Sequence, residues 1–268
     1  MNFAKLQYLT GLSALALTMA SCETVPMSNK AVDNHQVTAS DNKHQSQQWS
    51  YIGESGADYW GGLRAEYSQC DAGDQQSPIN IANTIAADIS SPIINWSPFI
   101  PTISNNGHTI EVKSPAGNTV ILGGKSFELV QFHFHHTSEH TIDDQQYPME
   151  AHFVHKADDG KLAVLAVLFA EGQANHQLTE IWGAAPAVIG EITANFILDP
   201  KQLLPIDRQH YRYQGSLTTP PCSQIVSWVV FKQKPTISAQ QIAAFATVFD
   251  ENARPVQKTN RRYITRSK

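Results

Sequence analysis

Two histidine-bearing segments constrain this chain more than any other feature of its sequence. His133 and His135 stand two residues apart, and His152 lies in a second segment with the same alternation of polar and apolar residues. Successive side chains of a β-strand point to opposite faces, so His133 and His135 share one face if this segment is a strand. Two such strands side by side would aim three imidazoles at one point. Three neutral imidazoles with an open fourth position make a catalytic zinc site rather than a closed structural one.

The composition limits what the rest of the chain can be. Its 268 residues, 41% of them hydrophobic, are enough for one sizeable core or two modest ones. The formal net charge is -5 and there is no basic block, which argues against a nucleic-acid partner. Three cysteines are too few for a disulfide-dense small protein or for a zinc cluster made of thiolates.

The N-terminal residues 1–21 have the pattern of a secretory signal peptide. Lys5 supplies the positive start, residues 6–19 are mostly apolar, and two small residues precede Cys22. The apolar run is too short and too polar to be a transmembrane helix. Residues 17–22 also resemble a bacterial lipobox, which would make Cys22 the site of lipidation and tether the protein to a membrane. Ordinary cleavage, giving a soluble periplasmic protein, is the alternative.

Residues 22–48 are polar, aperiodic and almost free of aromatic side chains. A segment of this composition cannot bury enough apolar surface to order itself, so it is predicted to be a disordered linker. Aromatic residues return at Trp49, and no second linker follows. The sequence therefore predicts one folded domain over residues 49–268, a length that a β-rich single domain accommodates.

Short β-type segments separated by turn residues dominate this domain. We predict strands over residues 127–136 and 149–156, which carry the histidines, and strands buried on both faces over 162–169 and 225–232. Residues 109–113 and 119–122 flank a turn and are predicted to form a hairpin. A capping box at residues 238–241 predicts an amphipathic helix over 239–249, and a second helix is expected near 176–183. These patterns are typical of a mainly β fold, with a large, mostly antiparallel sheet and short peripheral helices.

Five further motifs accompany the histidine strands. They are Glu139-His140 and residues 75–80, 105–108, 215–221 and 252–255. Together they resemble the α-class carbonic anhydrases over about residues 49–260, with the motifs in the family's order. The short connection from His135 to Glu139 is similar to the bacterial, exported branch. The resemblance implies a twisted central sheet of about ten strands. It also implies reversible hydration of CO2 to bicarbonate and a proton, by attack of a zinc-bound hydroxide.

The resemblance also implies the roles of individual residues. His133, His135 and His152 match the zinc ligands. Thr218 and Glu139 match the pair that orients the hydroxide, because a hydroxyl can donate its one proton to a carboxylate that only accepts.

His108 matches the residue that carries protons to solvent, a role suited to an imidazole that titrates near neutrality. Tyr51 and Asn106 match residues that order the connecting water chain, although Asn106 could equally serve only to form its turn.

Residues around the ligands are implied in the same way. Gln131 matches the family's partner for His133, and Glu150 its partner for His152; each pair also shares one strand face. Asn252 matches the residue whose backbone carbonyl holds His135.

An apolar pocket for CO2 is implied at Val154, Val164, Leu217, Val226 and Trp228, with Thr219 beside bicarbonate. By the same resemblance, Cys70 and Cys222 are expected to form a disulfide. The partners are then CO2 and bicarbonate, in a monomer or a homodimer.

The remaining histidines of the domain are expected to have no role in catalysis. His136 and His155 have the wrong strand parity for the zinc, and His140 is expected to make a structural hydrogen bond. His176 and His210 are expected to be peripheral.

Three alternatives stay open from the sequence. His133, His135 and Glu139 also satisfy the short cupin pattern, in which a glutamate ligates iron or manganese. However, Lys156 occupies the place after His152 where a cupin's second motif has asparagine. A non-catalytic carbonic-anhydrase-like binding domain would lack zinc histidines, and this chain lacks none. A periplasmic zinc carrier would hold labile metal and perform no CO2 chemistry.

Overall fold

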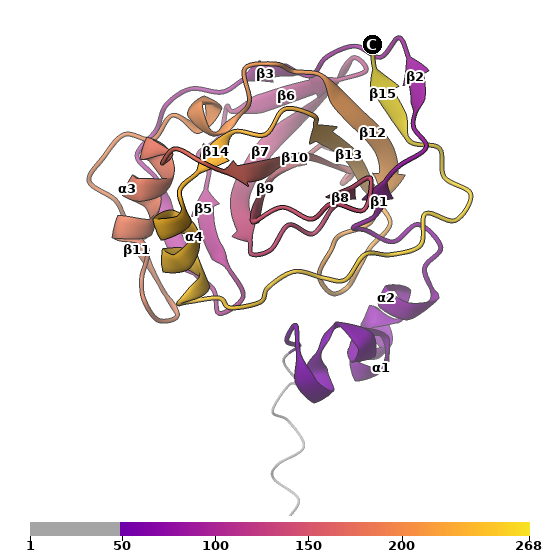
Figure 1. Cartoon of the computed structure of the whole chain (residues 1–268), viewed down its shortest axis with the longest axis horizontal. Helices are drawn as coiled ribbons and strands as arrows, with labels where there is room; N and C mark the ends of the chain where they lie inside the picture. The colour runs from indigo at the N-terminus through magenta and orange to yellow at the C-terminus, as the bar shows by residue number, and fades with distance from the viewer. Residues whose placement is uncertain (1–48) are drawn as a thin grey trace, which may run out of the picture. The chain divides into compact units, whose positions relative to one another are not determined.

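A mixed sheet of 13 strands organises the residues that the computed structural model describes, 49–268 (Figure 1). The strands along its main path, in spatial order, are β11 (Gly190–Thr193), β4 (Thr102–Asn105), β5 (Ile110–Lys113), β7 (Lys125–His135), β9 (Met149–Lys156), β10 (Leu162–Glu171), β13 (Val226–Phe231), β12 (His210–Gly215), β15 (Thr265–Ser267) and β2 (Ile85–Ala87). The others are β3 (Ile93–Asn95), β6 (Thr119–Leu122) and β14 (Thr236–Ile237), and a separate small sheet pairs β1 (Asn80–Ile81) with β8 (Thr141–Ile142). The predictions for residues 1–48, namely the signal peptide, the linker and a lipidated Cys22, lie outside the described residues.

Most neighbouring strands run antiparallel, as the sequence predicted. Parallel pairs occur where β10 meets β13 and β14, where β15 meets β2, and between β1 and β8. Strands β7 and β9, which carry the three histidines, pair antiparallel near the middle of the sheet. Because β7 and β9 each pair with a strand on either side, the backbone that carries the three histidines is held in place from both sides.

The predicted hairpin between residues 109–113 and 119–122 is wrong. Strands β5 and β6 do not pair with each other; both pair with β7, β5 along residues 131–133 and β6 along 125–128. β5 and β6 therefore lie end to end beside the long strand β7. The turn between them lies next to the bulge near Val130 of β7. The sequence correctly indicated a turn, but β5 and β6 each form their strand hydrogen bonds with β7 and not with each other.

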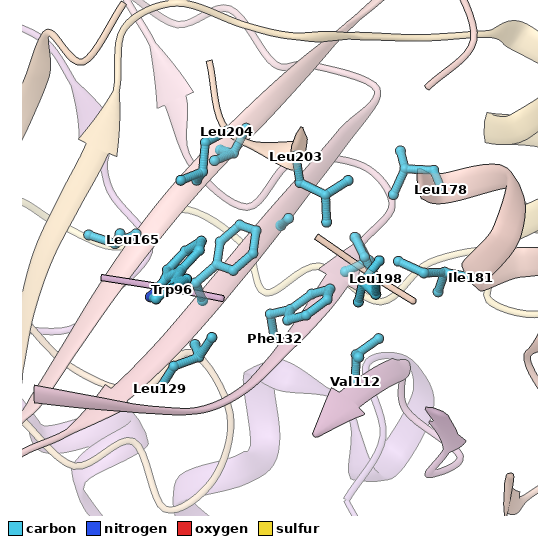
Figure 2. Close-up of a cluster of buried hydrophobic side chains, with 14 of the residues drawn as sticks. Trp96, Val112, Leu129, Phe132, Leu165, Leu178, Ile181, Leu198, Leu203 and Leu204 are labelled. Carbon is cyan, nitrogen blue, oxygen red and sulfur yellow. The ribbon is translucent and has the colours of Figure 1, made fainter. Parts of the chain in front are cut away.

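Two apolar clusters lie on opposite faces of the sheet. The larger one is built around Trp96, Phe132 and Phe153 and is covered by helix α3 and the segment with Leu198 (Figure 2). The smaller one is built around Trp228. Alternate residues of β10 enter the two clusters, and Ala163 through Phe169 are all buried, which confirms the prediction of a strand covered on both faces.

Two helices pack beside this sheet near the places that the sequence predicted. Helix α3 (His176–Ala184) begins after Asn175, whose side chain caps its first turn. Helix α4 (Ala239–Ala246) begins with the predicted capping box, in which Ser238 and Gln241 bond each other's backbone N–H groups. It ends three residues earlier than predicted. No helix in residues 49–268 is long and apolar enough to cross a membrane.

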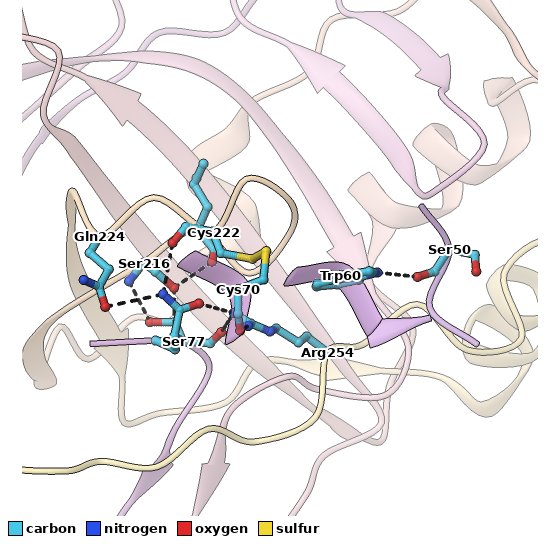
Figure 3. Close-up of a disulfide and its surroundings, with 10 residues drawn as sticks. Ser50, Trp60, Cys70, Ser77, Ser216, Cys222, Gln224 and Arg254 are labelled. Carbon is cyan, nitrogen blue, oxygen red and sulfur yellow. Dashed lines mark hydrogen bonds between the residues drawn. A yellow bond between two sulfur atoms is a disulfide. The ribbon is translucent and has the colours of Figure 1, made fainter. Parts of the chain in front are cut away.

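The segment that begins the described region contains short helices that the sequence did not predict. They are α1 (Trp60–Leu63), α2 (Gln69–Ala72) and 3₁₀ turns at Gly53–Ser55, Ala57–Tyr59 and Ala65–Tyr67; a further 3₁₀ turn spans Pro200–Leu203. A disulfide joins Cys70 in α2 to Cys222, with an S–S distance of 2.09 Å (Figure 3). The expected disulfide is thereby confirmed, and it fastens this segment to the loop between β12 and β13.

Candidate active site

The three predicted histidines converge between β7 and β9. His133 lies directly opposite His152 in the antiparallel ladder, and His135 lies opposite Glu150. The ring centroids are 4.5 to 5.4 Å apart. One nitrogen from each ring lies within 4.8 Å of those of the other two. The side chains of residues 133 and 135 therefore lie on one face of the sheet, as their spacing predicted, and form a cluster of imidazoles there with His152.

Each ring is held by a hydrogen bond from its other nitrogen. The three pairs are His133 Nδ1 with Gln131 Oε1 at 2.8 Å, His135 Nδ1 with the Asn252 carbonyl at 2.7 Å, and His152 Nε2 with Glu150 Oε1 at 2.8 Å. These bonds fix which nitrogen of each ring carries the proton. They leave His133 Nε2, His135 Nε2 and His152 Nδ1 with lone pairs for a ligand.

The chemistry of these nitrogens fits a zinc ion. His135 Nε2 is buried and has no hydrogen-bond partner among the described residues, which is costly for a polar atom unless a ligand satisfies it. Burial lowers the pKa of His133 and of His135, so both rings are neutral at physiological pH. Neutral imidazole is the form that binds metal ions, and three of them leave a fourth coordination position open.

A buried carboxylate adjoins the cluster. Glu139 follows β7 and is 1% exposed. Its Oε1 accepts a hydrogen bond from the Arg254 backbone N–H at 2.8 Å. Its Oε2 lies 3.5 Å from His135 Nε2 and 3.7 Å from His152 Nδ1, and has no hydrogen-bond partner among residues 49–268. One carboxylate oxygen is thus fixed by the backbone while the other remains available beside the histidines.

Thr218 lies on the loop between β12 and β13 and is buried. The Leu217 N–H donates to the Ser223 carbonyl, and the Cys222 N–H donates to the Thr219 carbonyl, so the loop is closed on itself. The disulfide of Cys222 fastens it further (Figure 3). The hydrogen bonds of the described residues include none between Thr218 and Glu139, so the structure does not show the predicted pair in contact.

Comparison with known proteins identifies the family. A protein-family model described as eukaryotic-type carbonic anhydrase matches residues 55–268. The chain belongs to the α-class carbonic anhydrase family. It is accordingly a zinc enzyme that interconverts CO2 and bicarbonate, and the family match decides against the cupin alternative.

Bacterial carbonic anhydrases are among its relatives. The one from Neisseria gonorrhoeae is 41% identical over 218 residues, which are 81% of this chain and 86% of that protein. The one from Pectobacterium carotovorum is 42% identical over 231 residues, covering 85% and 92%. The solved structure of the α-carbonic anhydrase from Thermovibrio ammonificans with the inhibitor sulfanilamide has a TM-score of 0.80 and 41% identity, and covers 81% of this chain and 98% of that one.

His108 lies on the turn between β4 and β5 of this carbonic anhydrase and is half-buried. Its ring stacks on Trp49 with centroids 3.7 Å apart and planes 9° apart. It lines a cavity of about 520 Å³, together with Trp49, Tyr51 and Asn252. Partial burial lowers the pKa of His108 below its ordinary value.

The two residues predicted to assist His108 differ in what they contact. The Asn106 side-chain oxygen accepts the backbone N–H groups of His108 and Thr109, so this amide holds the turn. Tyr51 lies against Trp60 and His108, and its hydroxyl has no hydrogen bond within the described residues. Burial, and to a lesser extent the charge of Glu139, raises the pKa of Tyr51 well above its ordinary value, so its hydroxyl stays protonated.

The residues predicted to form the CO2 pocket gather in the smaller apolar cluster. Its buried members include Val164, Val226 and Trp228, and the half-buried Val154 and Leu217 pack against them. The Trp228 ring lies 4.9 Å from the His152 ring. Thr219 is half-buried on the loop that carries Thr218.

Sequence reasoning missed several contacts around the site. The Asn252 side-chain amide donates to the carbonyls of His108 and Phe134, in addition to the backbone bond that was expected. The Arg254 backbone N–H holds Glu139, and its guanidinium binds Gln76. Arg254 lies in a motif that the sequence singled out, but these partners are more than 100 residues away along the chain.

The other histidines lie outside the imidazole cluster. His155 is buried on the opposite face against Trp96, and His136 bonds the Asp250 carbonyl. His140 bonds Glu150, as a structural histidine should.

Proposed function

We propose that His133, His135 and His152 hold the catalytic zinc of this carbonic anhydrase. The observation that carries the proposal is the convergence of three ring nitrogens, each left free because the other nitrogen is bonded to the protein. Zinc bound there would lower the pKa of a water molecule to about 7, a value characteristic of carbonic anhydrases as a class, and would so supply hydroxide at neutral pH. Gln131, Glu150 and the Asn252 carbonyl keep the rings oriented.

Thr218 and Glu139 orient the nucleophile in this proposal. The Thr218 hydroxyl donates to Glu139 Oε2, which leaves the Thr218 oxygen to accept a hydrogen bond from the nucleophile. The free and buried Oε2 supports this role, because Oε1 is already occupied by the Arg254 N–H. The closed loop around Thr218 supports it as well, since an orienting hydroxyl must be held in place.

We also propose that His108 transfers the proton released in each cycle to solvent. Its half-buried ring beside the cavity of about 520 Å³ supports this role. Burial lowers the pKa of His108, so the ring is neutral at pH 7 and has a nitrogen lone pair that can accept a proton. Tyr51 borders the same cavity, where it would help to order the water chain, and Asn106 serves by shaping the turn that presents His108.

CO2 is small and uncharged, so its site should be an apolar surface next to the nucleophile. We propose that this surface is formed by Val154, Val164, Leu217, Val226 and Trp228, whose membership of one apolar cluster beside His152 supports the assignment. Thr219, next to Thr218, is proposed to contact bicarbonate.

We propose that the enzyme is periplasmic. The proposed division of the chain is a signal peptide over residues 1–21, a linker over residues 22–48 and the catalytic domain over residues 49–268. A disulfide persists in oxidising compartments, and several of the relatives are bacterial carbonic anhydrases. Lipidation of Cys22 would tether the enzyme to a membrane, and either a monomer or a homodimer is compatible with the proposed site.

Stopped-flow CO2 hydration before and after zinc removal tests the site. Fast hydration should disappear with a chelator and return with zinc. A folded His135→Ala variant that hydrates CO2 as fast as the wild-type protein would contradict the ligand assignment. Growth on a radiolabelled lipid precursor tests the anchor separately, because only a lipidated Cys22 incorporates label.

A further inference from the structure

Charge is unevenly distributed along this chain. Residues 208–268 contain ten lysines and arginines but only two acidic residues, a net charge of +8, whereas residues 1–207 contain nine and 22, a net charge of -13. The two acidic residues of the C-terminal part, Asp250 and Glu251, line the cavity beside His108. The net charge of -5 for the whole chain is therefore the sum of a strongly basic C-terminal part and an acidic remainder, although no long run of basic residues marks the basic part.

Much of this positive charge gathers at one edge of the large sheet, where β12, β15 and β2 lie beside the C-terminus (Figure 1). In the ladder between β12 and β15, Arg266 lies opposite Tyr211, the neighbour of Arg212. Lys232 follows β13, and its Nζ donates to the Ser267 carbonyl of β15 at 2.8 Å. We call the cationic side chains here the basic edge: Arg212, Lys232, Arg261, Arg262, Arg266 and Lys268.

No carboxylate forms an ion pair with the basic edge in the part of the chain that the structure describes. The ion pairs of lysine and arginine within residues 49–268 lie elsewhere; they are Arg64–Glu66, Lys113–Glu191 and Lys125–Asp159. Two cations of the edge lie over aromatic rings instead. Lys232 Nζ is 5.6 Å from the centroid of the Tyr211 ring, and the Arg262 guanidinium is 5.6 Å from that of Tyr213. The positive charge of the edge is therefore available to an external anion.

Two exposed apolar side chains accompany these cations. Tyr263, which follows Arg262, is 78% exposed, and Ile85 on the outermost strand β2 is 48% exposed. Ile85 lies opposite Thr265 of β15, so it belongs to the same edge. Aromatic and aliphatic side chains beside lysine and arginine are the combination that enters the headgroup region of a bilayer. A nucleic acid or an acidic protein would be bound by the cations alone.

We propose that the basic edge docks on an anionic lipid surface. Its cations meet the lipid phosphates, while Tyr263 and Ile85 enter the headgroup layer. The turn that carries His108 joins β4 to β5, near the opposite end of the strand order. Docking through the basic edge therefore leaves the cavity beside His108 open to solvent, where bicarbonate and protons are released. The inference depends neither on the zinc ligands nor on lipidation of Cys22.

Vesicle co-sedimentation tests the proposal with the mature chain, residues 22–268, carrying Cys22→Ser so that no lipid is attached. The vesicles contain about 30% phosphatidylglycerol in phosphatidylcholine, and vesicles of phosphatidylcholine alone are the reference. The protein should bind the anionic vesicles, and binding should weaken as NaCl is added, because salt screens the attraction. Equal binding to both kinds of vesicle would overturn the proposal.

A charge variant locates the contact. Arg261→Gln/Arg266→Gln/Lys268→Gln removes three cations of the basic edge that the fold leaves at least partly exposed. Each basic residue near an anionic surface strengthens binding about fivefold, so this variant should bind the anionic vesicles about 100-fold more weakly than the unsubstituted chain. Its rate of CO2 hydration should be unchanged, which shows that it is folded.

The matched control removes three cations elsewhere. Lys156→Gln/Lys161→Gln/Lys201→Gln changes the net charge by the same amount at exposed positions outside the basic edge. This control should bind the anionic vesicles at least tenfold more tightly than the variant of the basic edge. Equal binding by the two variants would show that net charge drives the association, and would overturn the assignment to this edge.

Tyr263→Ser distinguishes a lipid surface from a soluble polyanion. Removal of the exposed ring should weaken binding to the anionic vesicles about tenfold, because apolar surface no longer enters the headgroup layer. Binding to dextran sulfate, which offers charge without a headgroup layer, should not change. A Tyr263→Ser variant that binds the vesicles as tightly as the unsubstituted chain would assign the edge to a soluble polyanion and overturn the docking on lipid.

Discussion

His155 makes the stability of this enzyme sensitive to acid. Its ring is 0% exposed and is stacked against Trp96, with centroids 5.5 Å apart. Its Nδ1 donates to the Phe153 carbonyl at 2.9 Å, with the Ala163 carbonyl at 3.3 Å, and its Nε2 has no partner among residues 49–268. Protonation would place a charge and an unpaired N–H in the apolar core, so burial lowers the pKa of His155 from 6.5 to about 4.

The sign of the pH effect follows from this lowered pKa. Between about pH 6.5 and pH 4 the unfolded chain binds a proton at His155 that the folded protein does not, so acid favours unfolding. The contribution of the neutral His155 ring to stability is fully present above pH 6.5 and is lost as the pH falls toward 4. A fall of about 2.5 in pKa corresponds to about 3 kcal/mol of unfolding free energy.

The assay is urea unfolding of the wild type and of His155→Phe at pH 7.5 and at pH 4.5. Phenylalanine keeps the stacking on Trp96 but cannot titrate. Release of zinc at low pH affects both proteins alike, so the difference between them isolates His155. The wild type should lose about 2 to 3 kcal/mol more than His155→Phe over this range. The control replaces the exposed His176 by glutamine, which should leave the change of unfolding free energy with pH as it is in the wild type. Equal pH slopes for wild type and His155→Phe would refute the reasoning.

Three further predictions concern the disulfide and the metal site. Cys70→Ser/Cys222→Ser should lower the unfolding free energy by up to about 5 kcal/mol, because the bond closes a separation of 152 residues; a loss below about 1 kcal/mol in urea unfolding would contradict this. His135→Ala should abolish stoichiometric zinc, measured by atomic emission, and CO2 hydration with it. Thr218→Ala should bind zinc normally but lower kcat/KM about 100-fold, and an unchanged kcat/KM would contradict the orienting role.

Local rules were enough to predict the centre of the site. The period of two residues along a strand put His133 and His135 on one face, and it put each of Gln131 and Glu150 on the face of the histidine that it holds. Continuous apolar runs identified β10 as a strand buried on both faces. These inferences succeeded because each depends only on residues within one strand.

Features that depend on distant partners could not be predicted in the same way. The turn between β5 and β6 suggested a hairpin, but both strands pair with β7 instead. The stacking of His108 on Trp49 joins residues 59 positions apart, 108 minus 49, and no local pattern signals it. The hydrogen bond between Tyr213 and His140 was equally invisible, because the two residues lie 73 positions apart in the sequence. The disulfide was expected only through resemblance to a family.

The same distinction between local and distant partners explains where the zinc site is most vulnerable. His133 and His152 are each held by a side chain two residues earlier on the same strand, so any condition that keeps β7 and β9 paired also keeps these rings oriented. His135 is held by the Asn252 carbonyl, 117 residues away, in a segment without regular structure. The Asn252 side chain bonds Phe134 of β7 as well, which fastens that carbonyl in place. Loosening the segment around residue 252 should therefore free the His135 ring before those of His133 and His152.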